Sequence, residues 1–301
     1  SYYGQPVLKD PTWTWEIPTY FFAGGTAGAS AGLAYLSGLR GNDVLARRAW
    51  TVALTGLTVS PALLIADLGR PTRFLNMLRM FKVTSPMSVG SWILAASGAT
   101  TTLAAVDVWT GAFPRAGRVA RPLAAVLGLP LSTYTAALVS NTAVPVWHDA
   151  RGTIPFLFAS GAALSAGAAA LATTPPEHAK PARRLALASA VLEVFFSELM
   201  HRRLGDLGEP YKHGAPAVFS YLSEGSVLAG GVLLARRGRS SHAAAAAAGA
   251  LMCFGALSAR VSTWRAGFQS ASDPRYVVGP QRDRIERGER SGASRRQRRA
   301  R

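Results

Sequence analysis

Eight long stretches of this chain are almost free of charged residues, and this pattern constrains the fold more than any other feature. An α-helix needs about 20 apolar residues to cross the hydrocarbon core of a bilayer. Nearly all charged residues lie in the short connections between the stretches, as bilayer spans require. The stretches cover residues 18–39, 49–66, 89–106, 122–147, 152–176, 185–200, 214–235 and 243–259.

The pattern predicts an all-α integral membrane protein with about eight transmembrane helices. Short connections make sequential helices antiparallel neighbours, so we expect two up-down four-helix bundles. Glu193, Glu198 and Glu224 interrupt the sixth and seventh stretches, so seven or nine spans remain open, as does a large soluble helical core. The expected regions are an interfacial segment (1–17), a first bundle (18–147), a second bundle (148–264) and a basic tail (265–301).

The first stretch has glycines at regular spacing, with Gly24, Gly28 and Gly32 four residues apart. Residues at this spacing lie on one face of a helix. A face made of glycine has almost no side chains, so another helix can approach it closely. We therefore expect the first stretch to pack tightly against a neighbour.

The orientation is predicted from the basic residues of the loops. An even number of spans puts both termini on one side of the membrane, named side A, and the other side is side B. The short loops carry 12 lysines and arginines on side B and 9 on side A. Basic loops tend to stay in the cytoplasm, so the termini are expected to be extracytoplasmic in the cytoplasmic membrane. This orientation requires the nine arginines between residues 281 and 301 to cross the membrane, which is unfavourable, so the inverted arrangement remains open.

Histidine and cysteine are scarce in the expected spans. A transmembrane haem usually takes two histidines as axial ligands, and an iron–sulfur cluster takes several cysteines. The chain has one cysteine, Cys253, and its five histidines lie at connections or, for His201, at a helix end. We therefore expect no haem, no iron–sulfur cluster and no metal site. Any electron would have to come from a partner's cofactor, and the chain is not expected to be an enzyme alone.

The loop at residues 67–88 combines basic and apolar residues with helical spacing. Pro71 suits the first turn of a helix. Apolar residues then recur on one face and basic residues on the other, which predicts a short interfacial amphipathic helix. One interpretation of this loop is an anchor to lipid. The apolar residues are Phe74, Leu75, Leu78 and Phe81, and the basic ones are Arg70, Arg73, Arg79 and Lys82.

Two blocks of sequence strongly resemble the NrfD family, the membrane subunits of polysulfide reductase and related oxidoreductase complexes. They are YYGQPVLKDPTWTWEIPTYFFAGG at residues 2–25 and DLGRPTRFLNMLRMFKVTSPMSVGSW at residues 67–92. The likeness is weaker over YTAALVSNTAVPVW at residues 134–147 and does not include the arginine-rich tail.

The resemblance implies a quinone-reactive subunit of a respiratory complex that carries no haem or cluster. Its quinone pocket would lie in the first bundle, near the face where an iron–sulfur subunit docks. That subunit would relay electrons to or from a molybdenum or tungsten catalytic subunit. The basic loop residues Arg70, Arg73, Arg79 and Lys82 are the expected docking residues. Membrane lipid is also an expected partner, especially of the basic tail, and nucleic acid is not.

Polar and aromatic residues gather at the side A ends of four stretches, which independently favours a quinone site there. A quinone needs a hydrogen-bond partner for each carbonyl, a proton route, and aromatic or aliphatic walls. The tryptophans could instead form an interfacial belt, and Asp67 could pair with a loop arginine. The expected quinone-binding residues are Tyr20, Ser88, Trp92, Tyr134 and Asn141, and those for proton exchange are Glu16 and Asp67.

Three glutamates lie within the apolar stretches of the second half. A carboxylate inside a membrane is costly, so it is a functional candidate. Glu193, Glu198, His201 and Glu224 form a candidate proton path. The alternative is that these carboxylates hold helices together through hydrogen bonds.

Two other functions use the same features. A secondary transporter would use the buried glutamates for coupling, although we find neither an internal repeat nor paired broken helices. A pure membrane anchor would touch no quinone at all. The sequence leaves open the catalytic partner's substrate, the direction of electron flow, and whether the quinone is menaquinone or ubiquinone.

Overall fold

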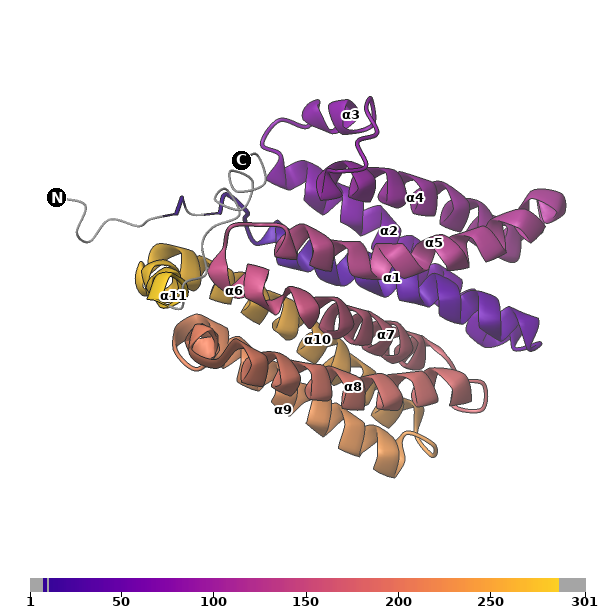
Figure 1. Cartoon of the computed structure of the whole chain (residues 1–301). Coiled ribbons are helices and arrows are strands. Elements are labelled where there is room, and N and C mark those ends of the chain that lie inside the picture. Colours follow the sequence, from indigo (N-terminus) through magenta and orange to yellow (C-terminus); the bar gives the residue numbers. More distant parts are fainter. Residues whose placement is uncertain (1–7, 10, 287–301) are drawn as a thin grey trace.

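The computed structural model describes residues 8–9 and 11–286, and within these residues all regular structure is helical (Figure 1). Two of the segments are short 3₁₀ helices, labelled η. The long helices are α1 (Glu16–Leu39), α2 (Asp43–Asp67), α4 (Pro86–Thr110), α5 (Pro114–Ser140), α7 (Ile154–Thr173), α8 (Lys180–Leu204), α9 (Gly214–Arg237) and α10 (His242–Ser272). The short ones are α3 (Arg73–Met77), α6 (Pro145–Asp149), η1 (Ala150–Gly152), η2 (Gly205–Tyr211) and α11 (Arg275–Glu286).

Local sequence signals set where the helices begin and end. Ser85 and Ser241 cap α4 and α10 by accepting a hydrogen bond from the backbone N–H three residues later. Pro86 and Pro114 occupy first-turn positions, where a missing N–H costs nothing. Gly111 follows α4 with a φ of 68°, a conformation that glycine adopts without steric cost.

The eight long helices form two groups that lie side by side (Figure 1). In the first group α1 packs on α2 and α5, and α4 also packs on α2 and α5. In the second group α7 packs on α8 and α10, and α9 packs on α10 and α8. The groups meet mainly where α7 contacts α1 and α5. Connections are short, so successive long helices run in opposite directions.

Each predicted apolar stretch overlaps one of the eight long helices, and the all-α prediction is confirmed for the described residues. Among the described residues, six helices are long and apolar enough to cross a membrane, namely α2, α4, α5, α7, α9 and α10. The other two long helices, α1 and α8, fall outside this set. In α1 the apolar residues are diluted by glycine, serine and threonine, and α8 has charged residues at both ends and two glutamates within.

Several boundaries differ from the prediction, and the clearest differences are the following. The stretch at 122–147 falls on two helices, since α5 ends at Ser140 and α6 starts at Pro145. In addition, α5 starts at Pro114, before the expected residue 122. The last long helix continues past the expected end at residue 259 as far as Ser272. The amphipathic helix expected from Pro71 onward is only the five-residue α3.

Candidate functional site

Two tyrosines from different helices meet near the side A end of the first group. Tyr20 of α1 is only 2% exposed, and its ring centroid lies 6.5 Å from that of Tyr134 of α5. Gly90 of α4 packs directly against the Tyr134 ring, so that a Cβ atom at this position would overlap the ring. The absence of a side chain at Gly90 therefore lets three helices converge on the tyrosine pair.

The two predicted proton-exchange residues have different surroundings. Glu16 is the first residue of α1, one helical turn before Tyr20, and its Oε2 atom is buried without a hydrogen-bond partner. Asp67, at the end of α2, accepts hydrogen bonds from the Thr14 N–H at 3.1 Å and the Thr14 hydroxyl at 2.7 Å. Asp67 thus fastens the segment before α1 to the end of α2, while one oxygen of Glu16 remains free to bind.

Three of the predicted quinone-binding residues lie apart from the tyrosine pair. The Ser88 hydroxyl donates to the Met80 carbonyl at 3.0 Å, and Trp92 Nε1 donates to the same carbonyl at 3.4 Å. Both side chains therefore hold the loop before α4 in place. Asn141 is exposed at the end of α5. Within the described residues, none of the three makes a hydrogen bond or ring contact with either tyrosine.

Trp147, expected in an interfacial belt or a pocket wall, is instead a buried link between the two helix groups. It is 1% exposed, its Nε1 donates to the Thr263 carbonyl of α10 at 2.7 Å, and its ring stacks on Trp13 with centroids 5.3 Å apart. Gly267 of α10 leaves room for the indole, since a Cβ there would overlap the ring. Trp13 and Thr14 together hold the segment before α1 across the side A end.

The loop between α2 and α4 folds back on the start of α4, on the outer side of the first group (Figure 1). Its basic side chains are exposed and make no ion pair among the described residues. Leu75, Met80, Phe81 and Val83 are also exposed. The loop therefore presents a surface that is both cationic and apolar, with Arg70, Arg73, Arg79 and Lys82 as its cations.

The second group contains a buried acid and a buried base, of which the sequence interpretation found only the acid. Glu193 of α8 is 3% exposed and Arg260 of α10 is 2% exposed. A Cβ atom at Gly161 of α7 would lie 2.7 Å from Glu193 Oε1 and 3.0 Å from Arg260 Nη2, so the two side chains face the same glycine. Arg260 also donates to the Phe158 carbonyl at 2.7 Å and lies over the Phe158 ring.

The other residues of the candidate proton path are only partly brought together. Two hollows of about 10 and 20 Å³, each large enough for about one water, share Ser197 as a lining residue. Glu193 and Glu224 line the first, and His201 and Tyr211 line the second. Burial raises the pKa of the Tyr211 phenol, which keeps it a hydrogen-bond donor.

Glu198 lies outside this row of polar groups. Its carboxylate is exposed and pairs with Arg202, with 2.6 Å between Nε and Oε1. Of the four residues predicted as one path, Glu193, His201 and Glu224 therefore line the hollows, whereas Glu198 belongs to a surface ion pair. Spacing alone could not separate them, because Glu198 and His201 are three residues apart and were expected to share a face.

The described residues contain no group of three or more histidine, cysteine, aspartate or glutamate side chains that could hold a metal ion. The candidate residues described above carry phenols, carboxylates, an imidazole, a guanidinium and indoles. These groups can donate hydrogen bonds and exchange protons.

The chain was compared with protein families and with curated proteins. The family model described as "Polysulphide reductase, NrfD" matches residues 7–201, which include α1 to α7 and most of α8. No curated protein matches the chain. The matched region contains the tyrosine pair, the basic loop and Glu193, and it covers more than half of the sequence. The chain therefore belongs to the NrfD family of polysulphide reductase membrane subunits.

Proposed function

We propose that this multi-pass membrane protein is the quinone-reactive subunit of its complex. It passes electrons between an iron–sulfur partner and the membrane quinone pool, and all eight long helices cross the membrane. Membership of the NrfD family implies work within a reductase complex. The observation that carries the proposal is the Tyr20–Tyr134 pair with the free carboxylate oxygen of Glu16 one turn away.

The chemistry required is the gain of two electrons and two protons by a quinone, or the reverse. A phenol hydroxyl can donate a hydrogen bond to a quinone carbonyl and so fix the ring, and a nearby carboxyl group can supply or accept a proton. Tyr134 and Glu16 fit these two roles. Asp67 fits less well, because Thr14 already occupies one of its oxygens. Electrons come from, or go to, the partner's cluster.

The Tyr134→Phe variant tests the quinone site. Loss of one hydrogen bond to the quinone should lower quinone-linked turnover about 3- to 10-fold, since such a bond contributes about 0.5–1.5 kcal/mol. Reduction of a soluble dye by the catalytic partner should be unchanged. Tyr221→Phe, at an exposed position of α9, is the matched control. Unchanged quinone turnover in Tyr134→Phe would argue against the site.

We further propose that the exposed loop between α2 and α4 docks the iron–sulfur subunit. Reversing Arg73 and Arg79 to glutamate should release that partner from washed membranes at ordinary salt, because two cations of the contact surface become anions. The same reversal at Arg236 and Arg237, exposed at the end of α9, should leave it bound. If the iron–sulfur partner stays bound to membranes that carry the loop variant, the docking proposal fails and the loop is an anchor to lipid.

We propose the orientation that the more basic loops of side B favour. With side B cytoplasmic, the docking loop and both termini are extracytoplasmic. A tag placed after Arg301 should then be removed by protease added to intact cells stripped of any outer barrier. Cleavage of the tag only after lysis would show that the orientation is the opposite one, with the partner subunits in the cytoplasm.

In the second group, we propose that the row from His201 through Ser197 and Glu224 to Glu193 carries protons from the side A end into the membrane. These residues line two small hollows, each of a size for about one water. A secondary transporter would use the same carboxylates. Co-purification with an iron–sulfur protein supports the electron-transfer function. A chain that purifies without partners and transports a solute supports the transporter.

A further inference from the structure

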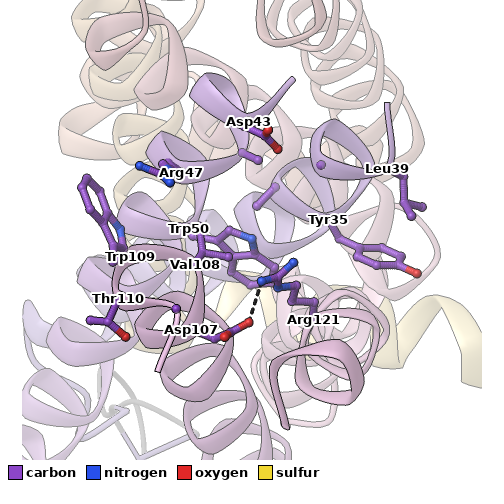
Figure 2. Close-up of a pocket in the computed structure, with 14 residues that line it drawn as sticks. Tyr35, Leu39, Asp43, Arg47, Trp50, Asp107, Val108, Trp109, Thr110 and Arg121 are labelled. Atoms are coloured by element: carbon purple, nitrogen blue, oxygen red, sulfur yellow. Dashed lines mark hydrogen bonds and ion pairs between the residues drawn. The ribbon is translucent and has the colours of Figure 1, made fainter. Parts of the chain in front are cut away.

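A cavity of about 550 Å³ lies at the side B end of the first group (Figure 2). Its lining residues are at the opposite ends of α1 and α5 from Tyr20 and Tyr134. The end of α1, the start of α2, the end of α4 and the start of α5 surround it. Its volume is within the range of sites that hold small molecules. The lining residues used below are Tyr35, Asp43, Arg47, Trp50, Asp107 and Arg121.

An ion pair between the buried Asp107 and the partly exposed Arg121 forms one wall of this cavity. Asp107 Oδ2 lies 2.5 Å from Arg121 Nη2, and the Asp107 side chain is only 2% exposed. Gly117 on α5 makes the pair possible, because a Cβ atom there would overlap the carboxylate. Arg121 Nε is buried without a hydrogen-bond partner. One donor at this wall is therefore unused by the protein.

A second acid and a second base line the cavity without pairing. Asp43 and Arg47 lie one turn apart at the start of α2, and both are exposed. Figure 2 shows their side chains at separate places on the rim, and the described residues contain no ion pair with either. The cavity thus offers a free anion and a free cation a few residues apart, which is the complement of a zwitterion.

The surroundings of the cavity are those of a membrane interface. Trp109 also lines it, is 49% exposed, and donates through Nε1 to the Thr51 hydroxyl at 3.2 Å. Leu36, Leu39 and Phe113 nearby are more than half exposed, which suits acyl chains better than water. Tryptophan is enriched where a span meets the lipid head groups. A ligand in this cavity can therefore extend apolar tails over the helix ends.

We propose that this cavity binds the head group of a zwitterionic phospholipid that has a phosphate and a primary ammonium. Arg47 binds the phosphate, and Asp43 accepts hydrogen bonds from the ammonium. Tyr35 and Trp50 also line the cavity. Arginine suits phosphate because its planar fork gives two parallel hydrogen bonds. The lipid would fix the side B ends of four helices.

The proposal is tested by lipid titration of the delipidated protein, purified with its co-purifying subunits, with native mass spectrometry as the readout. Dioleoyl phosphatidylethanolamine should bind the parent protein, and Arg47→Gln should weaken that binding about tenfold, as expected for a lost charged hydrogen bond. Arg48→Gln, an exposed neighbour outside the cavity lining, should bind like the parent. Equal binding by all three proteins would overturn the site.

Three further ligands test the proposed chemistry. Dioleoyl phosphatidylglycerol has no ammonium, dioleoyl phosphatidylcholine has an ammonium without N–H donors, and soluble glycerophosphoethanolamine has no tails. Each should bind the parent more weakly than the ethanolamine lipid, and Asp43→Asn should reduce the preference over phosphatidylglycerol. Equal binding of phosphatidylglycerol would show a general anion site instead. Equal binding of glycerophosphoethanolamine would show a site for a soluble compound.

Discussion

Replacing Arg260 by methionine should destabilise the protein by about 3–5 kcal/mol, because Glu193 would then be buried without its facing cation. The expected measurement is a marked fall in the midpoint of thermal unfolding in detergent. Arg265→Met provides a control on the same helix, at an exposed position five residues later. A melting temperature equal to that of the parent would mean that Arg260 does not compensate the buried carboxylate.

The double variant Glu193→Gln with Arg260→Met separates structure from proton transfer. Removal of both charges should restore most of the lost stability, since no uncompensated charge remains. If Glu193 belongs to the proton path, the stable double variant should still fail to move protons during quinone turnover in proteoliposomes. Normal proton movement in that variant would leave Glu193 and Arg260 a purely structural pair.

The second large effect is expected at Gly28, where α1 and α5 touch backbone to backbone. A Cβ atom at Gly28 would overlap the Gly128 carbonyl oxygen, and backbone atoms cannot rotate away as a side chain can. Gly28→Ala should therefore cost about 1–3 kcal/mol or more by overpacking. Gly32→Ala is the matched control, because no atom lies within 4 Å of its Cβ position.

Thermal unfolding of the two glycine variants checks this contact. The Gly32 variant should match or slightly exceed the stability of the parent, since alanine is the better helix former by about 0.5–1 kcal/mol. Similar behaviour of both variants would contradict the close approach of α1 to α5. The sequence predicted one bare face from Gly24, Gly28 and Gly32, whereas the structure gives Gly28 the critical contact on it.

The parts of the fold that depend on local composition could be predicted from the sequence. Apolar stretches located all eight long helices, and caps such as Ser85 follow standard rules. The family could also be identified, because its two blocks are continuous segments at residues 2–25 and 67–92. These features need no knowledge of which helices touch.

Contacts between distant segments could not be predicted in this way. Arg260 follows residue 259, where the last predicted stretch ended, yet α10 continues and buries Arg260 near Glu193. Asp107 lay at the edge of a predicted span, and its partner Arg121 is set by the register of α4 against α5. A pair between Asp67 and a loop arginine was one alternative for this residue, but among the described residues its carboxylate accepts hydrogen bonds from Thr14 instead. Each of these depends on tertiary packing.

The stacking of Trp13 on Trp147 has a consequence for the order in which the protein is made. Trp147 donates to the Thr263 carbonyl and packs against Gly267, both on α10, which is synthesised after the seven other long helices. Trp13 is synthesised before all eight of them, but the surface on which it stacks is complete only after α10 has packed against Trp147. Final placement of Trp13 therefore depends on the insertion of α10.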